Sequence, residues 1–159
     1  MEEVKLHWYA LKVFWRKINP VEEKFDEMGL EYYAQSILPS YLFVRTDNQT
    51  IKKLRLEFFG KFYVYSDYVT KEPTVVPDKE LEIFRIVTSA GDTGLQFLDE
   101  DAEKYRKGDK VRVIDGPFKG AEGYVVRIKK DRRLVVTISG VAAIATSYIP
   151  QELLEKVYE

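Results

Sequence analysis

The sequence of 159 residues contains no cysteine and only one histidine, His7. The absence of cysteine excludes disulfide bonds, a thiol nucleophile and every cysteine-ligated zinc or iron–sulfur site. His7 precedes a strand-like run, and we interpret it as an ordinary edge side chain. Long hydrophobic runs are also missing, since the longest aliphatic stretch, residues 141–145, is far shorter than the roughly 20 residues that span a bilayer. With no signal-peptide pattern, we expect a cytoplasmic protein with no membrane contact.

Residue constellations that carry out chemistry are missing as well. Residues 116–120 read Gly-Pro-Phe-Lys-Gly but lack the Lys-Ser/Thr that completes a phosphate-binding loop. The acidic run at 99–103 lacks the central glycine and terminal Glu of a calcium-binding loop, so a solvated linker is the better interpretation. We therefore predict that the protein is not an enzyme and needs no cofactor or metal.

Charge is almost balanced over the whole chain but unevenly distributed. The 25 Lys and Arg face 26 Asp and Glu, for a formal net charge of -1. Residues 106–133 hold ten Lys or Arg against four Asp or Glu, whereas residues 1–98 hold thirteen against fifteen. Any attraction for nucleic acid must therefore come from a local patch in the C-terminal part.

The first 88 residues have the pattern of an α+β domain. Strand-like alternation, rich in aromatic and β-branched side chains, covers residues 7–15 and recurs in three shorter segments: 31–37, 41–45 and 61–66. Start signals and apolar spacing predict three helices: residues 19–29, a segment capped by Asp47 or Asn48, and residues 78–88. We predict an antiparallel sheet with flanking helices over residues 1–88.

Residues 89–159 differ in composition from the first part. The stretch 89–105 contains two glycines and an acidic cluster with little periodicity, and we predict a linker. From residue 106 onward the apolar period becomes two, with glycine-rich or charged turns between the runs. We predict a small all-β barrel over residues 106–159.

The barrel segment contains a motif that resembles a known family. Residues 107–128 read KGDKVRVIDGPFKGAEGYVVRI, which resembles a KOW motif and implies an SH3-like β-barrel. The residues that match the motif are Gly116, Pro117, Phe118, Gly120 and Gly123. Its glycines suit a tight turn, a positive φ or a crowded backbone between strands. KOW motifs occur both in ribosomal proteins and in NusG-type transcription factors.

The first 88 residues resemble the N-terminal domain of NusG. The opening strand reads Trp-Tyr-Ala-Leu-Lys-Val at 8–13, residues 38–45 read Leu-Pro-Ser-Tyr-Leu-Phe-Val-Arg, and Val-Pro-Asp-Lys-Glu at 76–80 matches the run that opens the family's last helix. The resemblance therefore spans nearly the whole chain in the right order. It implies a bacterial transcription elongation or antitermination factor that suppresses pausing or termination and performs no chemistry.

Three departures from the patterns of this family matter, and we favour a specialised antitermination paralogue of the UpxY or RfaH type, the kind associated with polysaccharide operons. The family's basic hairpin excursion between residues 35 and 38 is almost absent. Lys-Lys-Leu at 52–54 replaces the His-Thr-Thr with which specialised members touch the opposite jaw of RNA polymerase. Ser-Gly-Val at 139–141 replaces the Phe-Gly-Arg with which general members meet Rho or a ribosomal protein.

The resemblance implies two kinds of contact in the first part of the chain. An apolar surface would grip the clamp helices of the largest RNA polymerase subunit, and the matching residues are Trp8, Tyr9, Leu38, Pro39, Tyr41 and Phe43. Strand alternation leaves open that half of these are core residues. Arg16 and Lys17 match the position where specialised members touch the displaced non-template DNA strand.

The barrel carries a second basic group around a predicted hairpin turn: Arg127, Lys129, Lys130, Arg132 and Arg133. Its candidate partners are non-template DNA, nascent RNA, a ribosomal protein or Rho, and we expect the chain itself to be a monomer. Two other functions remain open. The protein could be an RNA-binding KOW protein of the ribosome or its assembly, although a pI of 6.0 argues against permanent burial in RNA, or a protein-binding adaptor.

Overall fold

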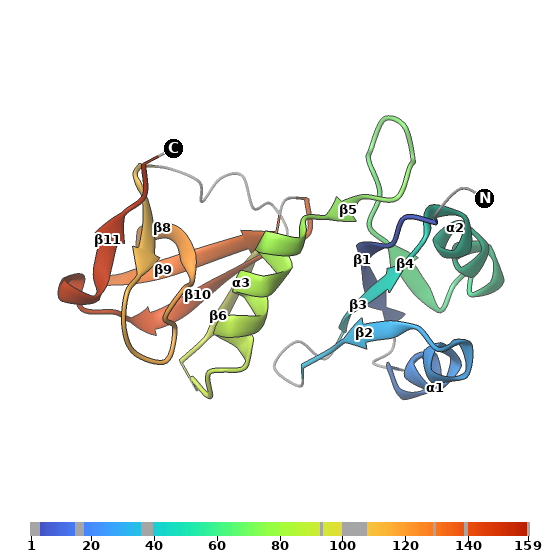
Figure 1. The fold of residues 1–159 in the computed structure, drawn as a ribbon, viewed down its shortest axis with the longest axis horizontal. Coiled ribbons are helices and arrows are strands. Elements are labelled where there is room, and N and C mark those ends of the chain that lie inside the picture. The colour runs from blue at the N-terminus through green and yellow to red at the C-terminus, as the bar shows by residue number, and fades with distance from the viewer. Residues whose placement is uncertain are drawn as a thin grey trace. The chain divides into compact units, whose positions relative to one another are not determined.

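The structure is a computed structural model that describes residues 4–14, 18–35, 40–92, 94–99, 108–128, 130–138 and 140–158 (Figure 1). The chain divides into two compact units, Met1–Asp78 and Lys79–Glu159. Within the described ranges, no helix is long and apolar enough to cross a membrane.

An antiparallel sheet forms the centre of the first unit. Its strands lie in the order β2-β3-β1-β4, and β5 also pairs with β1. The elements are β1 (His7–Val13), α1 (Ile18–Met28), β2 (Glu31–Tyr33), β3 (Tyr41–Thr46), α2 (Asn48–Glu57), β4 (Phe62–Val64) and β5 (Val75–Val76). The predicted α+β architecture is confirmed, although β1, β2 and β4 are shorter than the segments expected from alternation.

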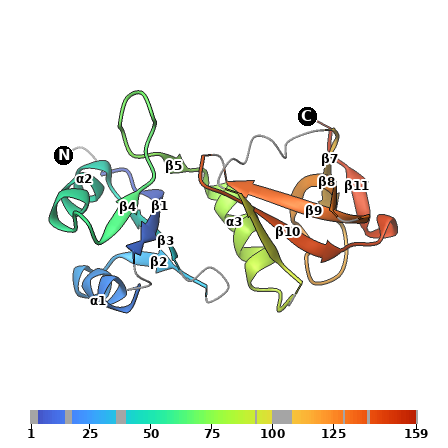
Figure 2. The ribbon, with the colours of Figure 1, turned by 180° about the vertical axis from the view of Figure 1, so that it is seen from behind.

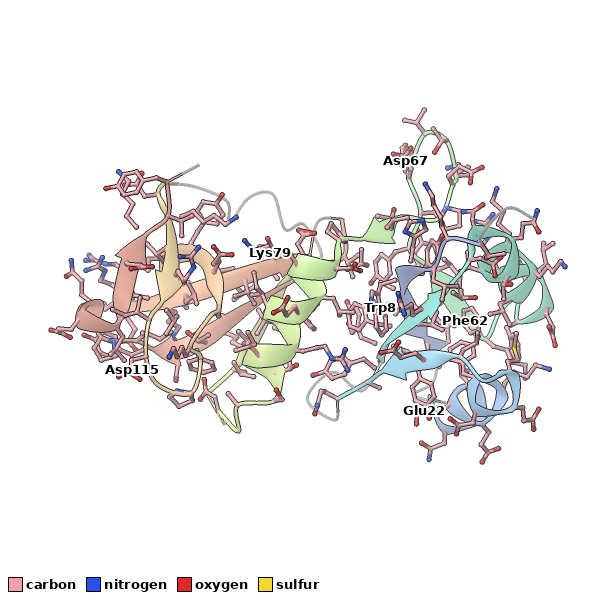
Figure 3. The ribbon with its side chains drawn as sticks, viewed as in Figure 1. Trp8, Glu22, Phe62, Asp67, Lys79 and Asp115 are labelled. Carbon is pink, nitrogen blue, oxygen red and sulfur yellow. The ribbon has the colours of Figure 1, made fainter. Side chains whose placement is uncertain are left out.

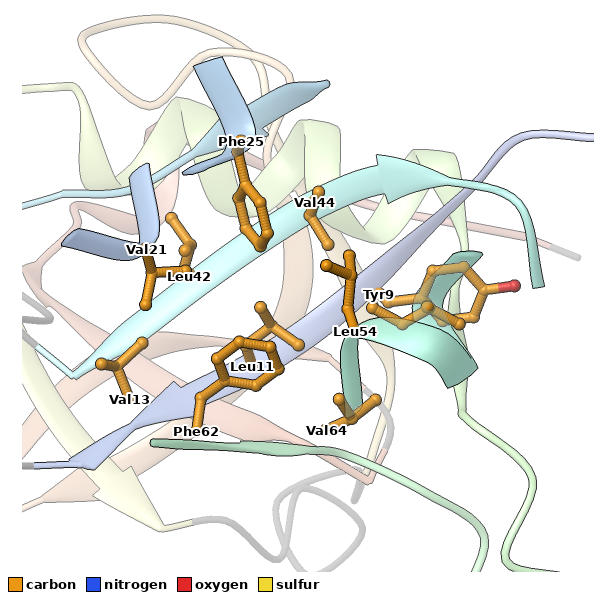
Figure 4. Packing of buried hydrophobic residues seen from close by; sticks show 11 residues of the cluster. Tyr9, Leu11, Val13, Val21, Phe25, Leu42, Val44, Leu54, Phe62 and Val64 are labelled. Atoms are coloured by element: carbon orange, nitrogen blue, oxygen red, sulfur yellow. The ribbon is translucent and has the colours of Figure 1, made fainter. Parts of the chain in front are cut away.

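Helices α1 and α2 cover one face of this sheet with a single apolar core. Phe25 of α1 and Leu54 of α2 pack against alternate residues of β1 and β3, as Figure 4 shows. The core residues of the sheet that share this face are Tyr9, Leu11, Val13, Leu42, Val44, Phe62 and Val64. Because successive side chains of a strand point to opposite faces, the residues between them face away from the helices.

Asp47 caps α2, one of the two alternatives that the sequence left open. Its carboxylate accepts hydrogen bonds from the Thr50 backbone N–H at 2.9 Å and from the Thr50 hydroxyl at 2.6 Å. These bonds, the hydroxyl bond above all, lower the pKa of Asp47. The cap satisfies a backbone donor that the first turn of a helix leaves unpaired, and so fixes where α2 begins after β3.

The second unit is built on an antiparallel sheet of six strands in the order β11-β7-β8-β9-β10-β6 (Figure 2). Its elements are α3 (Asp78–Thr88), β6 (Gln96–Asp99), β7 (Lys110–Val113), β8 (Glu122–Ile128), β9 (Asp131–Ile138), β10 (Ala142–Tyr148), the short 3-10 helix η3 (Gln151–Leu153) and β11 (Leu154–Lys156). The all-β organisation expected of a KOW barrel is thus present.

The boundary between the two units differs from the expected one. Helix α3 belongs almost entirely to the second unit, whereas the sequence interpretation assigned residues 1–88 to the first domain. The expected linker 89–105 includes β6, which pairs with β10 through Phe97 and Ile144. Helical periodicity predicts that α3 has a buried face but does not show which sheet that face meets, and an isolated four-residue edge strand has too short a pattern to be recognised.

Candidate partner-binding surfaces

The face of the first sheet that points away from α1 and α2 carries a layer of aromatic rings. Cross-strand pairing places Phe43 opposite Ala10 and Tyr41 opposite Lys12, on the side where alternation also puts Trp8. Tyr41 stacks on Tyr65 with ring centroids 6.1 Å apart, and the Tyr65 hydroxyl donates a hydrogen bond to the Tyr41 hydroxyl at 3.2 Å.

The rings of this aromatic layer differ in exposure. Trp8 and Tyr41 are each 6% exposed and Phe43 is 2% exposed. Tyr63, which meets Tyr65 edge to face with centroids 5.2 Å apart, is 46% exposed and forms the accessible edge of the layer. A partner can reach Tyr63 directly, whereas contact with Trp8, Tyr41 or Phe43 requires that these rings first be uncovered.

The prediction that Tyr9 contacts a partner does not agree with the structure. Tyr9 is completely buried and packs in the core between the sheet and the helices. The physical reason is strand alternation, because Trp8 and Tyr9 are neighbours in one strand and must point to opposite faces. Four other predicted contact residues, Arg16, Lys17, Leu38 and Pro39, lie outside the described residues.

An aromatic trough beside the exposed edge of this layer escaped sequence reasoning. Its cavity of about 520 Å³ is lined by Phe14, Phe59, Tyr63 and Tyr68 together with Arg55, Lys71 and Asp67. A neighbouring cavity of about 450 Å³ shares Phe14, Phe59 and Gly60. Phe59 and Tyr68 are 88% and 87% exposed, an unusual state for such large rings. The sequence did contain one indication that Phe59 is exposed, because this residue falls outside the apolar spacing of α2.

The rim of this aromatic trough is held by polar contacts of the loop after β4. Asp67 accepts hydrogen bonds from the backbone N–H groups of Thr70 and Val69, and these bonds lower its pKa. The Lys71 ammonium lies 4.7 Å from the centroid of the Tyr68 ring, within cation–π range. The loop, labelled at Asp67 in Figure 3, therefore presents Tyr68 in a defined position.

The KOW residues of the second unit shape its backbone. Gly120 has φ +94, a conformation that L side chains rarely adopt, and its N–H donates to the Val113 carbonyl at 2.9 Å. A Cβ on Gly123 would lie 2.2 Å from the Val135 carbonyl oxygen, which no side chain can accommodate. Phe118 is buried, whereas Gly116 and Pro117 lie exposed in the turn. The glycines of the motif therefore have a structural role in the barrel.

A buried carboxylate ties this motif to α3. The Glu122 side chain is 2% exposed, and its oxygens lie 2.8 Å from Lys79 Nζ and 2.8 Å from Arg112 Nη2. Burial alone would raise the pKa of Glu122, but the hydrogen bonds from Lys79 and Arg112 outweigh it and lower the pKa. Lys79 is labelled on α3 in Figure 3. The arrangement fixes the first turn of α3 on strand β8.

The predicted basic hairpin is formed by β8 and β9. Arg127 pairs directly with Arg132 across the two strands, and Lys130 lies in the two-residue turn. Arg133 is half-buried and reaches Asp131 at 3.8 Å. The fold thus brings four of the five predicted cations to one hairpin, while Lys129 lies outside the described residues.

Comparison with known proteins assigns the second unit to a family. Residues 107–139 match the KOW motif family. Over 44 residues the chain is 43% identical to the large ribosomal subunit protein uL24 of Spiroplasma citri. The matched stretch covers 28% of this chain and 74% of that protein. The chain is a KOW-motif protein, as the sequence predicted.

One solved structure extends the likeness in fold to nearly the whole chain. A structure described as domain interaction in Thermotoga maritima NusG is similar over 97% of this chain and 98% of that one, with 19% identity and a TM-score of 0.51. The MjSpt4:Spt5 complex in conformation B matches over 96% and 97%, with 14% identity and a TM-score of 0.36. The chain has a NusG-like fold, an α+β unit followed by a KOW barrel, which confirms the predicted fold class.

Proposed function

We propose that the protein is a transcription elongation and antitermination factor that binds RNA polymerase through its first unit and recruits a further partner through its barrel. The observation that carries this proposal is the aromatic layer on the sheet face opposite α1 and α2, with Tyr63 as its exposed edge, in a chain whose fold is NusG-like throughout. Binding energy at protein interfaces concentrates in a few large, rigid side chains, and aromatic rings are foremost among them.

The proposed activity is mechanical. The first unit would grip the clamp helices of the largest polymerase subunit and stabilise the closed, elongating state by binding it more tightly than paused or opened states. Such an allosteric brace needs no acid, base, metal or cofactor, so we propose that the protein is not an enzyme and acts as a monomer in the cytoplasm. Its effect on pausing is limited by its difference in affinity between the two polymerase states.

Within this proposal we favour a specialised paralogue, because Ser-Gly-Val at 139–141 replaces the Phe-Gly-Arg of general members. One contact of the specialised members is nevertheless not expected. The position of the His-Thr-Thr motif is taken here by Lys52, Lys53 and Leu54 on α2. Leu54 is buried in the core and Lys52 forms an ion pair with Glu72 at 2.8 Å. Two of the three residues thus have intramolecular roles, which argues against the additional jaw contact of the specialised members and leaves the aromatic surfaces as the main attachment.

Co-purification of tagged protein with RNA polymerase tests the proposal. Tyr63→Ala should lower the amount of captured polymerase about tenfold or more, because Tyr63 is the exposed edge of the aromatic layer. Tyr158→Ala is the matched control, since this tyrosine is 81% exposed on the barrel unit. Absence of polymerase from the wild-type sample would refute the proposed function, and equal capture by both variants would remove Tyr63 from the interface.

A ribosomal role is the second candidate, favoured by the match to uL24 over 44 residues. In that case the protein would co-sediment with ribosomal subunits and would do so without polymerase. Sedimentation of cell extract through a sucrose gradient separates the two functions. Tight binding in the ribosomal fractions at moderate salt would favour the ribosomal role, whereas a position with polymerase would favour transcription.

A further inference from the structure

We propose that the barrel holds one unpaired nucleotide of a single-stranded nucleic acid, with the base in a small cavity at the β8–β9 hairpin and the phosphates on Arg127, Lys130 and Arg132. We call this cavity the hairpin pocket. The inference rests on the proposed function in assigning partner recruitment to the barrel, and it specifies that partner.

The hairpin pocket has the size of one aromatic ring. Its volume is about 140 Å³, and cavities of about 150 Å³ in other proteins hold benzene. The apolar residues of its lining are Val125, Leu134, Ile149 and Leu154, beside the ring of Tyr148. Arg132, Gln151 and Glu152 add polar groups to the lining. A ring-sized cavity with apolar walls and amide and carboxylate groups matches the shape and hydrogen-bonding edge of an unstacked base.

The register of the hairpin places the cations next to this cavity. Val125 pairs with Leu134, and two residues further along Arg127 pairs with Arg132. Directly paired residues share one face of a sheet, and so do residues two apart in a strand, so the two guanidinium side chains extend the wall of the pocket. A phosphate attached to a base in the pocket would therefore meet positive charge beside it.

The charges on this hairpin remain available to a ligand. In the described part of the chain, Arg127, Lys130 and Arg132 have no carboxylate within 4 Å, while Arg133 is the cation that faces Asp131. Arg132 Nη1 donates a long hydrogen bond of 3.4 Å to Gln151 Oε1. A phosphate would displace little on binding here.

Two features of the hairpin weaken it as a structural element. Arg127 and Arg132 are like charges directly opposite each other, which destabilises a strand pair. Lys130 has φ +75 in a two-residue turn where Asn or Gly is preferred. Neither choice improves folding, and such local costs are common where residues serve a ligand.

The combination favours a nucleic acid over an acidic protein. An acidic side chain would satisfy the cations but has no ring to fill the hairpin pocket, and inside it would meet the Glu152 carboxylate of the lining. The same carboxylate can accept a hydrogen bond from the amino group of a base. A base inside a duplex cannot enter a cavity of this kind, so the ligand is single-stranded.

Fluorescence anisotropy with the full chain tests the inference. The probes are short single-stranded RNA and DNA oligonucleotides of the same sequence, measured over a salt series, with a polyglutamate peptide as competitor. The Arg127→Gln, Lys130→Gln, Arg132→Gln triple variant should reduce the slope of log affinity against log salt by about 2, since each single-strand phosphate contact contributes about 0.7. Lys119→Gln, an exposed cation of the same barrel, should leave the slope unchanged.

Gln151→Ala tests the pocket itself without changing charge. It should weaken binding about tenfold and reduce discrimination among bases while the salt slope stays constant. Circular dichroism of each variant shows whether the barrel remains folded. The RNA and DNA arms identify the source of the strand, because only RNA presents a 2′-hydroxyl.

The outcomes separate this inference from the proposed function. If neither oligonucleotide binds, if the triple variant keeps the parent slope, or if polyglutamate competes as well as RNA, the hairpin pocket is not a nucleotide site. In each of these cases polymerase capture would be unaffected. Conversely, oligonucleotide binding by a protein that fails to capture polymerase would sustain the pocket and refute the transcription role.

Discussion

Lys79 Nζ lies 2.8 Å from Glu122 Oε2, so the first turn of α3 is bonded to the first residue of strand β8 in the KOW motif. The two residues are 43 positions apart in sequence, and Lys79 is 68% exposed while the Glu122 side chain is 2% exposed. A buried carboxylate needs such partners, because burial without them costs several kcal/mol. The ion pair is therefore one of the contacts that join α3 to the barrel unit.

Replacing Glu122 with Gln should destabilise the second unit by about 1–2 kcal/mol at neutral pH, because two charge-assisted hydrogen bonds become weaker. The expected loss of stability is small because solvent partly screens the charges of Lys79 and Arg112. Urea unfolding of the full chain measures it. Glu155→Gln is the control, since Glu155 meets the same arginine from an exposed position and should cost less than half as much.

The same carboxylate predicts a pH dependence. Its pKa is lowered in the folded state, so its contribution is fully present above the unfolded value of about 4.3 and is lost as pH falls through the folded value. The difference in stability between wild type and Glu122→Gln should therefore be constant from pH 7 to pH 5 and shrink toward pH 3. A difference that grows on acidification would contradict the ion pair.

The helices of this fold could be predicted from the sequence, because caps and apolar spacing are local signals. Asp47 and the spacing of Ile51 and Leu54 indicate α2 almost to the residue. The assignment of α3 to the barrel depends on non-local contacts, such as that of Lys79 with Glu122, which no periodicity encodes. For the same reason the exposed trough residue Phe59 escaped prediction, since exposure depends on the absence of neighbours in three dimensions.

Gly123→Ala should destabilise the barrel by about 3 kcal/mol, because its Cβ would lie 2.2 Å from the Val135 carbonyl oxygen and the β8–β9 pairing would have to open. Gly140→Ala is a control of the same chemistry. Gly140 has φ +73 but nothing within 4 Å of a Cβ, so that only the backbone preference, about 1 kcal/mol, is lost. Thermal unfolding distinguishes the two, and equal shifts would show that crowding at Gly123 is relieved.

Asp47→Ala should cost about 1 kcal/mol by removing the cap of α2. The lowered pKa of Asp47 means that this contribution is lost as pH falls through the folded value, so wild type and variant should converge in acid. Gln49→Ala, an exposed change in the same turn, is the control. Denaturant unfolding at two pH values measures both, and an equal loss for Gln49→Ala would assign the effect to helix propensity.

Substitutions at Tyr41 separate core packing from partner binding. Tyr41→Ala should remove a ring that stacks on Tyr65 and is 6% exposed, and should therefore destabilise the first unit by about 3 kcal/mol as well as weaken polymerase binding. Tyr41→Phe keeps the ring and removes only the hydroxyl that accepts a hydrogen bond from Tyr65 at 3.2 Å.

The free energy of unfolding and the capture of polymerase are measured for both variants together with Tyr63→Ala. We expect Tyr41→Phe to retain capture, Tyr63→Ala to lose capture at wild-type stability, and Tyr41→Ala to lose both. If Tyr41→Ala is unstable but still captures polymerase, Tyr41 is a core residue, and the attachment lies at Tyr63 and the aromatic trough.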